Sequence, residues 1–209
     1  GFTALITHSM HKVGEMSCNP AIGGLGKGHL VREIDALGGL MGIVADKSGI
    51  QFRLLNRKKG PAVRGPRTQA DRSLYRAEMQ KIIRESKGLD VIEGEATDIL
   101  FKEQAVRGVC LHNEKILAKA VVLTTGTFLN GVIHVGHEKI VGGRIGENAS
   151  IRLAEKLYDL GIVTGRLKTG TPPRILKSSI NWRAITYQDA DKDPEMFSFL
   201  HSKPFNEQI

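Results

Sequence analysis

The sequence has few cysteines, few acidic residues relative to basic ones, and no long apolar run. Its two cysteines, Cys18 and Cys110, cannot form a disulfide framework and lack the spacing of metal ligands, so we expect no metal site. No apolar stretch approaches the roughly eighteen residues of a membrane span, and no signal peptide is recognisable. We therefore expect a protein of a reducing, aqueous compartment that does not enter a membrane.

Because acidic residues are fewer than basic ones, the 209-residue chain has a formal charge of +8. This charge favours an anionic partner such as a nucleic acid or a phosphorylated cofactor. Most of the excess lies in residues 53–76, where eight basic side chains face one acid, Asp71. Such a run can be a solvated face. The Gly60-Pro61 and Gly65-Pro66 pairs within it favour a shaped loop instead. Aromatic residues are scarce there, so base stacking is poorly supported.

Residues 16–30 (MSCNPAIGGLGKGHL) hold four glycines in six positions, just before an apolar-periodic segment that predicts a helix over about 29–38. Glycine amides at a helix N-terminus suit an anion. A tight loop that merely enters a helix is the alternative interpretation. The spacing fits neither a Walker loop, because Gly28 follows Lys27, nor a dinucleotide fingerprint, because His29 takes the last glycine position.

The order of apolar segments predicts an α/β fold. Residues 3–7 have the composition of a buried parallel strand, and 89–93 predict a short strand, with a strand near 50–55 and a helix near 68–86 between them. Alternating segments near 96–101, 105–112 and 115–118 predict a small antiparallel meander. A buried strand at 120–127, a glycine-rich loop and a helix near 150–160 follow. Since no element precedes residue 3, we expect a fragment without its first βα unit.

Four segments resemble one family, the MnmG (GidA) flavoenzymes that modify tRNA uridines. They are Met16–Leu30, Asn56–Tyr75 (NRKKGPAVRGPRTQADRSLY), Val121–Leu129 (VVLTTGTFL) and Val163–Arg174 (VTGRLKTGTPPR). The resemblance covers nearly the whole chain and weakens after about residue 185.

The resemblance implies an FAD-binding, doubly wound (Rossmann-like) domain over residues 1–174, truncated at both ends, with 175–209 starting an inserted or second domain. It implies transfer of a carboxymethylaminomethyl or aminomethyl group to C5 of the wobble uridine of tRNA. The implied reagents are FAD, NADH as reductant, methylene-tetrahydrofolate as one-carbon donor, and glycine or ammonia. The implied partners are tRNA and an MnmE-type GTPase, as a homodimer or a heterotetramer with it, in a bacterial cytoplasm or a mitochondrial matrix.

The resemblance also implies roles for particular residues. Cys18 matches the family's reactive loop thiol, and a nearby lysine and helix N-terminus favour its thiolate; a small buried side chain is the alternative. The predicted flavin contacts are Gly23, Gly24, Gly26, Lys27, Gly28, Ala96, Gly126 and Ser150, although Ser150 could simply cap a helix. The predicted RNA or anion contacts are Lys58, Lys59, Arg64, Arg67 and Arg174, the last in a second basic cluster with Arg166 and Lys168.

The sequence departs from the family in lacking the N-terminal FAD fingerprint and the second reactive thiol. We therefore expect the isolated chain to bind flavin weakly or not at all and to be inactive alone. The first strand also ends in Thr7-His8 instead of the acid that commonly binds a ribose hydroxyl. Two other functions remain open: a folate- and flavin-dependent tRNA uridine methyltransferase, and a non-catalytic basic RNA-binding module.

Overall fold

The structure is a computed structural model that describes residues 1–209. The chain divides into two compact units. Unit 1 comprises Gly1–His11 and Gly88–Lys168, and unit 2 comprises Lys12–Lys87 and Thr169–Ile209. No helix is both long and apolar enough to cross a membrane.

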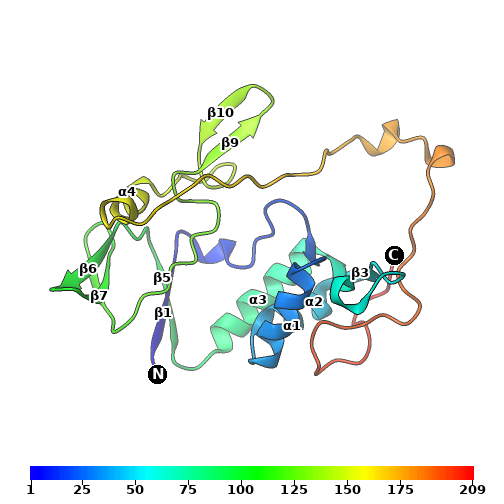
Figure 1. Ribbon diagram of the computed structural model, residues 1–209, viewed down its shortest axis with the longest axis horizontal. Helices are drawn as coiled ribbons and strands as arrows, with labels where there is room; N and C mark the ends of the chain where they lie inside the picture. Colours follow the sequence, from blue (N-terminus) through cyan, green and yellow to red (C-terminus); the bar gives the residue numbers. More distant parts are fainter. The chain divides into compact units, whose positions relative to one another are not determined.

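Unit 2 combines a three-stranded antiparallel sheet with three helices (Figure 1). The sheet has the order β2 (Ala21–Gly23), β4 (Gly65–Ala70) and β3 (Gly49–Leu55). The helices are α1 (Lys27–Ala36), α2 (Leu40–Ser48) and α3 (Arg72–Glu85). Helix α3 begins where the Asp71 carboxylate accepts the amide hydrogen of Leu74 at 2.9 Å, an N-cap that satisfies one of the free amides of the first turn.

The core of unit 2 recruits the C-terminal tail of the chain. Phe197, with no exposed surface, packs among buried residues of β2, α1 and α2. The fully buried Asp46 carboxylate of α2 accepts the amide hydrogens of Phe197 and Ser198 at 2.8 and 2.9 Å. Burial raises the pKa of Asp46, while those two amides and the ring of His201 oppose the rise. Residues 196–201 are therefore integral to the unit.

Unit 1 contains a parallel pair, an antiparallel meander and a hairpin. β1 (Thr3–Thr7) pairs in parallel with β5 (Leu89–Glu93). The meander consists of β6 (Asp98–Lys102), β7 (Ala105–Cys110) and β8 (Lys115–Leu117), and α4 (Ile151–Asp159) buries Leu153 and Leu157 against Ile99 of β6. β9 (Val132–Val135) and β10 (Glu138–Val141) form the hairpin (Figure 1). Short 3-10 helices lie at Met10–Lys12, Pro61–Val63, Lys177–Ser179 and Trp182–Ala184.

The predicted mixed α/β class, the strands at 3–7 and 89–93, the meander and the helix at the end of unit 1 are confirmed, and β1 is a parallel strand as predicted. The buried strand predicted at 120–127 is wrong. These residues form no strand, and Val122 is 83% exposed, because a strand needs hydrogen-bonded neighbours and the β1–β5 pair does not provide one here. The helix expected from residue 68 begins at Arg72, since Gly65–Ala70 forms β4 between two other strands. Helix α2 and the hairpin were not predicted.

A domain boundary at residue 174 stays a prediction. In the structure the tail beyond residue 189 packs on β3 and α2: the Asp191 amide donates to the carbonyl of Phe52, and the Ile209 amide to that of Ile50, both at 2.9 Å.

Candidate functional site

The glycine-rich loop lies between β2 and α1 in unit 2, and its backbone needs glycine. Gly23, Gly24 and Gly26 have φ of 93°, 101° and 74°, a region that other residues rarely adopt. Gly26 occupies the N-cap position of α1 without any side-chain cap. The predicted arrangement, a glycine run ending at a helix N-terminus, is therefore present.

Residues Gly65 and Pro66 of β4 hold this loop in place. The Gly24 amide donates to the Pro66 carbonyl at 2.9 Å, and Gly23 pairs with Arg67 in the β2–β4 ladder. A Cβ added to Gly23 or Gly28 would lie 2.2 or 2.5 Å from the Pro66 oxygen, closer than Cβ atoms come. These two glycines are therefore required by close backbone packing.

Gly24 and Gly26 differ, because a Cβ on either would meet no atom within 4 Å. The amides of Leu25, Gly26, Lys27 and His29 donate to no acceptor in the protein. Together with the helix dipole, equivalent to roughly half a positive charge, they present a donor surface with open space beside it. The Lys27 side chain is exposed at the same helix end. These groups fit an anionic group, including the reduced ring of a flavin.

His29, in the first turn of α1, carries two ring nitrogens that are enclosed and have no hydrogen-bond partner. A buried polar atom without a partner costs about 1–3 kcal/mol, so natural structures rarely leave one without a reason. The sequence interpretation treated His29 only as a break in a fingerprint. The structure adds it to the residues of interest around the loop.

Cys18 lies half-buried in the segment that leads into β2. Its Sγ is 4.0 Å from the hydroxyl of Thr169, and its carbonyl accepts a hydrogen bond from the Arg72 guanidinium at 3.1 Å. Cys18 is therefore partly accessible, and its contacts with Thr169 and Arg72 fix its position. Thr169 belongs to the Lys168–Arg174 segment, so two segments of the family resemblance meet here.

The predicted RNA-contacting residues occupy several environments in unit 2. Lys58 and Lys59 are exposed in the turn between β3 and β4. Arg64 is exposed and its Nε donates to the Lys59 carbonyl at 3.0 Å, whereas the half-buried Arg67 donates to Gln69 at 3.2 Å. Arg174 is exposed in an extended stretch. The turn therefore exposes three of the predicted cationic side chains, and its Arg57 is also exposed but pairs with Asp191.

The other predicted flavin contacts, Ala96, Gly126 and Ser150, lie in unit 1. Ala96 is half-buried against the Ile99 cluster, and Gly126 is exposed with φ of 56°. Ser150 is buried at the N-cap position of α4, yet its hydroxyl does not cap the helix. It lies instead 3.3 Å from Nε2 of His8, a residue at the end of β1, so the simple capping interpretation of Ser150 is wrong.

Sequence reasoning missed Arg72, Thr169 and Pro66 as residues that position the loop and its thiol. Arg72 was counted only as one charge in a basic run, and its neighbour Asp71 was not recognised as an N-cap. The Gly65-Pro66 pair was the one available signal, since it indicated a shaped chain in this region.

These features define a class of protein: a mixed α/β chain in which a glycine-rich turn leads into a helix N-terminus, with a partly accessible cysteine on the same unit and a cationic turn nearby. The model of one family, described as glucose inhibited division protein A, matches residues 1–209. The chain belongs to this family.

Relatives with known names support the assignment. The chain is 54% identical over 203 residues to the tRNA uridine 5-carboxymethylaminomethyl modification enzyme MnmG of Granulibacter bethesdensis, covering 95% of this chain and 32% of that protein. It is 51% identical over 205 residues to the protein of the same name from Campylobacter fetus, covering 98% of this chain and 33% of that protein. The chain thus spans about a third of the length of the curated relatives that it matches.

A solved structure agrees with the fold. The form II crystal structure of Aquifex aeolicus GidA matches 99% of this chain and 36% of its own, with a TM-score of 0.90 and 43% identity.

Proposed function

We propose that the protein is an FAD-dependent enzyme that installs a carboxymethylaminomethyl or aminomethyl group on C5 of the wobble uridine of tRNA. The observation that carries this proposal is the match of 95% of the chain, at 54% identity, to a relative named for that modification. The proposed reagents are NADH, methylene-tetrahydrofolate and glycine or ammonia. The proposed partner is an MnmE-type GTPase, with the enzyme as a homodimer in a bacterial cytoplasm.

In this proposal the glycine-rich loop binds the flavin ring. The free amides of Leu25, Gly26, Lys27 and His29 and the Lys27 ammonium lie where they can stabilise negative charge, and a Cβ on Gly24 or Gly26 would meet no protein atom within 4 Å. Bound flavin supplies the redox chemistry of the one-carbon transfer. Gly23 and Gly28 hold the loop against Pro66, so that the amides keep their orientation.

We propose that Cys18 is the nucleophile that activates the uridine ring. Its sulfur is half-buried, and the Arg72 hydrogen bond to its carbonyl fixes the backbone that carries it. The cationic turn with Lys58, Lys59 and Arg64 is the proposed contact for tRNA phosphates, with Arg67 and Arg174 as further contacts. Ala96, Gly126 and Ser150 stay proposed flavin contacts of unit 1.

The test uses Cys18→Ser in the full-length protein. We expect the variant to retain its flavin but to yield no modified wobble uridine when its tRNA is digested and analysed by mass spectrometry. A Cys110→Ser variant is the matched control and should modify tRNA normally. Normal modification by Cys18→Ser would show that this thiol is not the nucleophile.

A further inference from the structure

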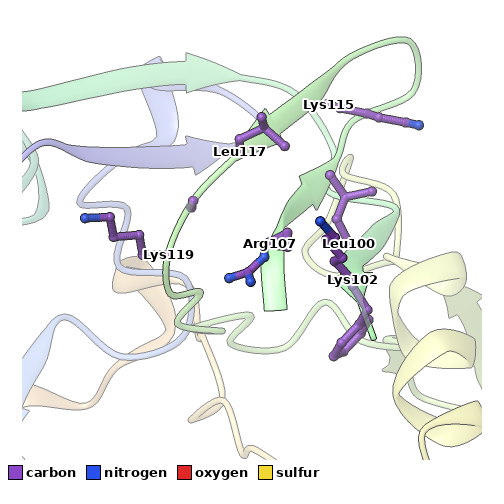
Figure 2. Close-up of a pocket in the computed structure, with 8 residues that line it drawn as sticks. Leu100, Lys102, Arg107, Lys115, Leu117 and Lys119 are labelled. Atoms are coloured by element: carbon purple, nitrogen blue, oxygen red, sulfur yellow. The ribbon is translucent and has the colours of Figure 1, made fainter. Parts of the chain in front are cut away.

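The outward face of the meander carries a hollow of about 580 Å³. Figure 2 shows Leu117 of β8 on one side of it and Leu100 and Lys102 of β6 on the other, with Arg107 of β7 between them. The opposite face of the same sheet buries Ile99 against α4. The hollow is therefore on the face that the core of unit 1 leaves uncovered.

Two local features of β7 open this hollow. Gly108 pairs with Leu100 of β6 and with Leu117 of β8, so the central residue of this cross-strand row has no side chain. A Cβ at Gly108 would lie 1.9 Å from the Ile116 carbonyl oxygen, which makes any other residue there incompatible with the present backbone. Next to it, the β6–β7 register shifts between Leu100 and Phe101, leaving Arg107 as the extra residue of a bulge. Bulges redirect side chains, and this one places a guanidinium at the hollow.

The hollow is lined by cations and apolar groups, and by no acidic side chain. Its four basic residues are Lys102, Arg107, Lys115 and Lys119, and none of them forms an ion pair within the protein. Its larger apolar side chains are Leu100 and Leu117, and Leu117 is 78% exposed, whereas the Phe101 side chain alternates to the face of Ile99. Four uncompensated positive charges around an exposed leucine favour a ligand that offers both negative charge and apolar surface.

We propose that this hollow is a second contact site for the tRNA substrate, where unpaired nucleotides place phosphates on Arg107 and Lys119 and a base against Leu117. Single-stranded nucleic acid combines these properties, because proteins bind it with a cationic groove and with aromatic or apolar side chains against its bases. Arginine also matches a phosphate with two parallel donors. The hollow belongs to unit 1 and the cationic turn to unit 2, and the proposal rests on the proposed function, since it takes tRNA as the substrate.

The experiment measures the affinity of the full-length protein for unmodified tRNA over a range of salt concentrations. The test variant combines Arg107→Gln with Lys119→Gln. The control combines Arg152→Gln with Lys139→Gln, two exposed cations of unit 1 outside the hollow. Each lost phosphate contact should weaken binding roughly fourfold at 0.15 M salt, so the test variant should bind roughly 14-fold more weakly, with a salt slope lower by about 1.4. The control should stay close to wild type.

Leu117→Ser tests the base contact, because it removes the exposed apolar side chain of the hollow; we expect weaker tRNA binding with an unchanged salt slope. If the test variant binds tRNA with the affinity and slope of the control, the proposal is overturned. If that variant instead loses binding to poly-glutamate while tRNA binding is intact, the hollow belongs to a protein partner and the proposal is likewise overturned. Failure of the proposed function looks different: wild-type protein would then form no modified uridine.

Discussion

Replacing Gly28 by alanine tests the packing of the glycine-rich loop with two opposing effects of known size. Alanine is favoured over glycine inside a helix by up to about 1 kcal/mol, so propensity alone predicts a more stable protein. Against this, the new Cβ would lie 2.5 Å from the Pro66 carbonyl oxygen and 2.9 Å from its Cδ. Neither atom is the end of a flexible side chain, so α1 or β4 must shift. Such overpacking costs typically about 1–3 kcal/mol.

We therefore expect Gly28→Ala to destabilise the protein by about 1–2 kcal/mol, measured by urea unfolding of the full-length protein and followed in the transition that includes unit 2. Flavin affinity should also fall, because the shift moves the open amides of the loop. Ala36→Gly at the far end of α1 is the matched control for propensity. A more stable Gly28→Ala protein would refute the reasoning, since it would show that the close approach to Pro66 does not constrain the helix.

Two further predictions concern the carboxylates that hold the tail. Asp46→Ala leaves the buried amides of Phe197 and Ser198 without an acceptor, which should lower the free energy of unfolding by about 1–3 kcal/mol for each amide. Chymotrypsin should therefore cleave the variant near Phe197 much faster than wild type. Unchanged cleavage would contradict this prediction. For Asp191, burial acts to raise the pKa, but hydrogen bonds from the Leu54 amide and the Arg57 guanidinium lower it overall. Its stabilising contribution is therefore present above the ordinary pKa of 3.8 and is lost as the pH falls through the lowered value. Hydrogen exchange at the Leu54 amide, corrected for intrinsic rates, should lose protection over that acidic range in wild type and show no such step in Asp191→Asn.

Much of the fold is predictable because its signals are local. β1, β5 and the meander follow from alternation and apolar runs of five or six residues, and α4 from its single apolar face. Helix α2 is not predictable in this way, because Gly42, Val44, Asp46 and Ser48 are buried around much of its circumference and leave no helical period. Residues 120–127 show the opposite case. Their apolar composition predicts a buried strand, but a strand also needs a neighbouring strand to pair with, and composition does not reveal whether one is present.

The site is predictable to the extent that it depends on glycine. The run from Gly23 to Gly28 indicates both the positive φ angles and the helix N-terminus. The glycines contact Pro66, which is some forty residues away in sequence. Arg72, which donates a hydrogen bond to the Cys18 carbonyl, is 54 residues from Cys18. No spacing rule connects such distant positions. The same limit applies to the tail, whose buried Phe197 gives no periodic signal.

The most direct test of the central claim, that the loop amides bind a flavin ring, is an FAD titration of the full-length protein and its Gly26→Ala variant followed by absorbance. A Cβ at Gly26 meets no protein atom but would lie beside the amides, and alanine also disfavours the φ of 74° there, so both effects act against the geometry that the loop presents to the ring. The account predicts that the wild type binds one FAD per chain and that the variant binds it at least tenfold more weakly. A wild-type protein that binds no flavin, or a variant with unchanged flavin affinity, would contradict it.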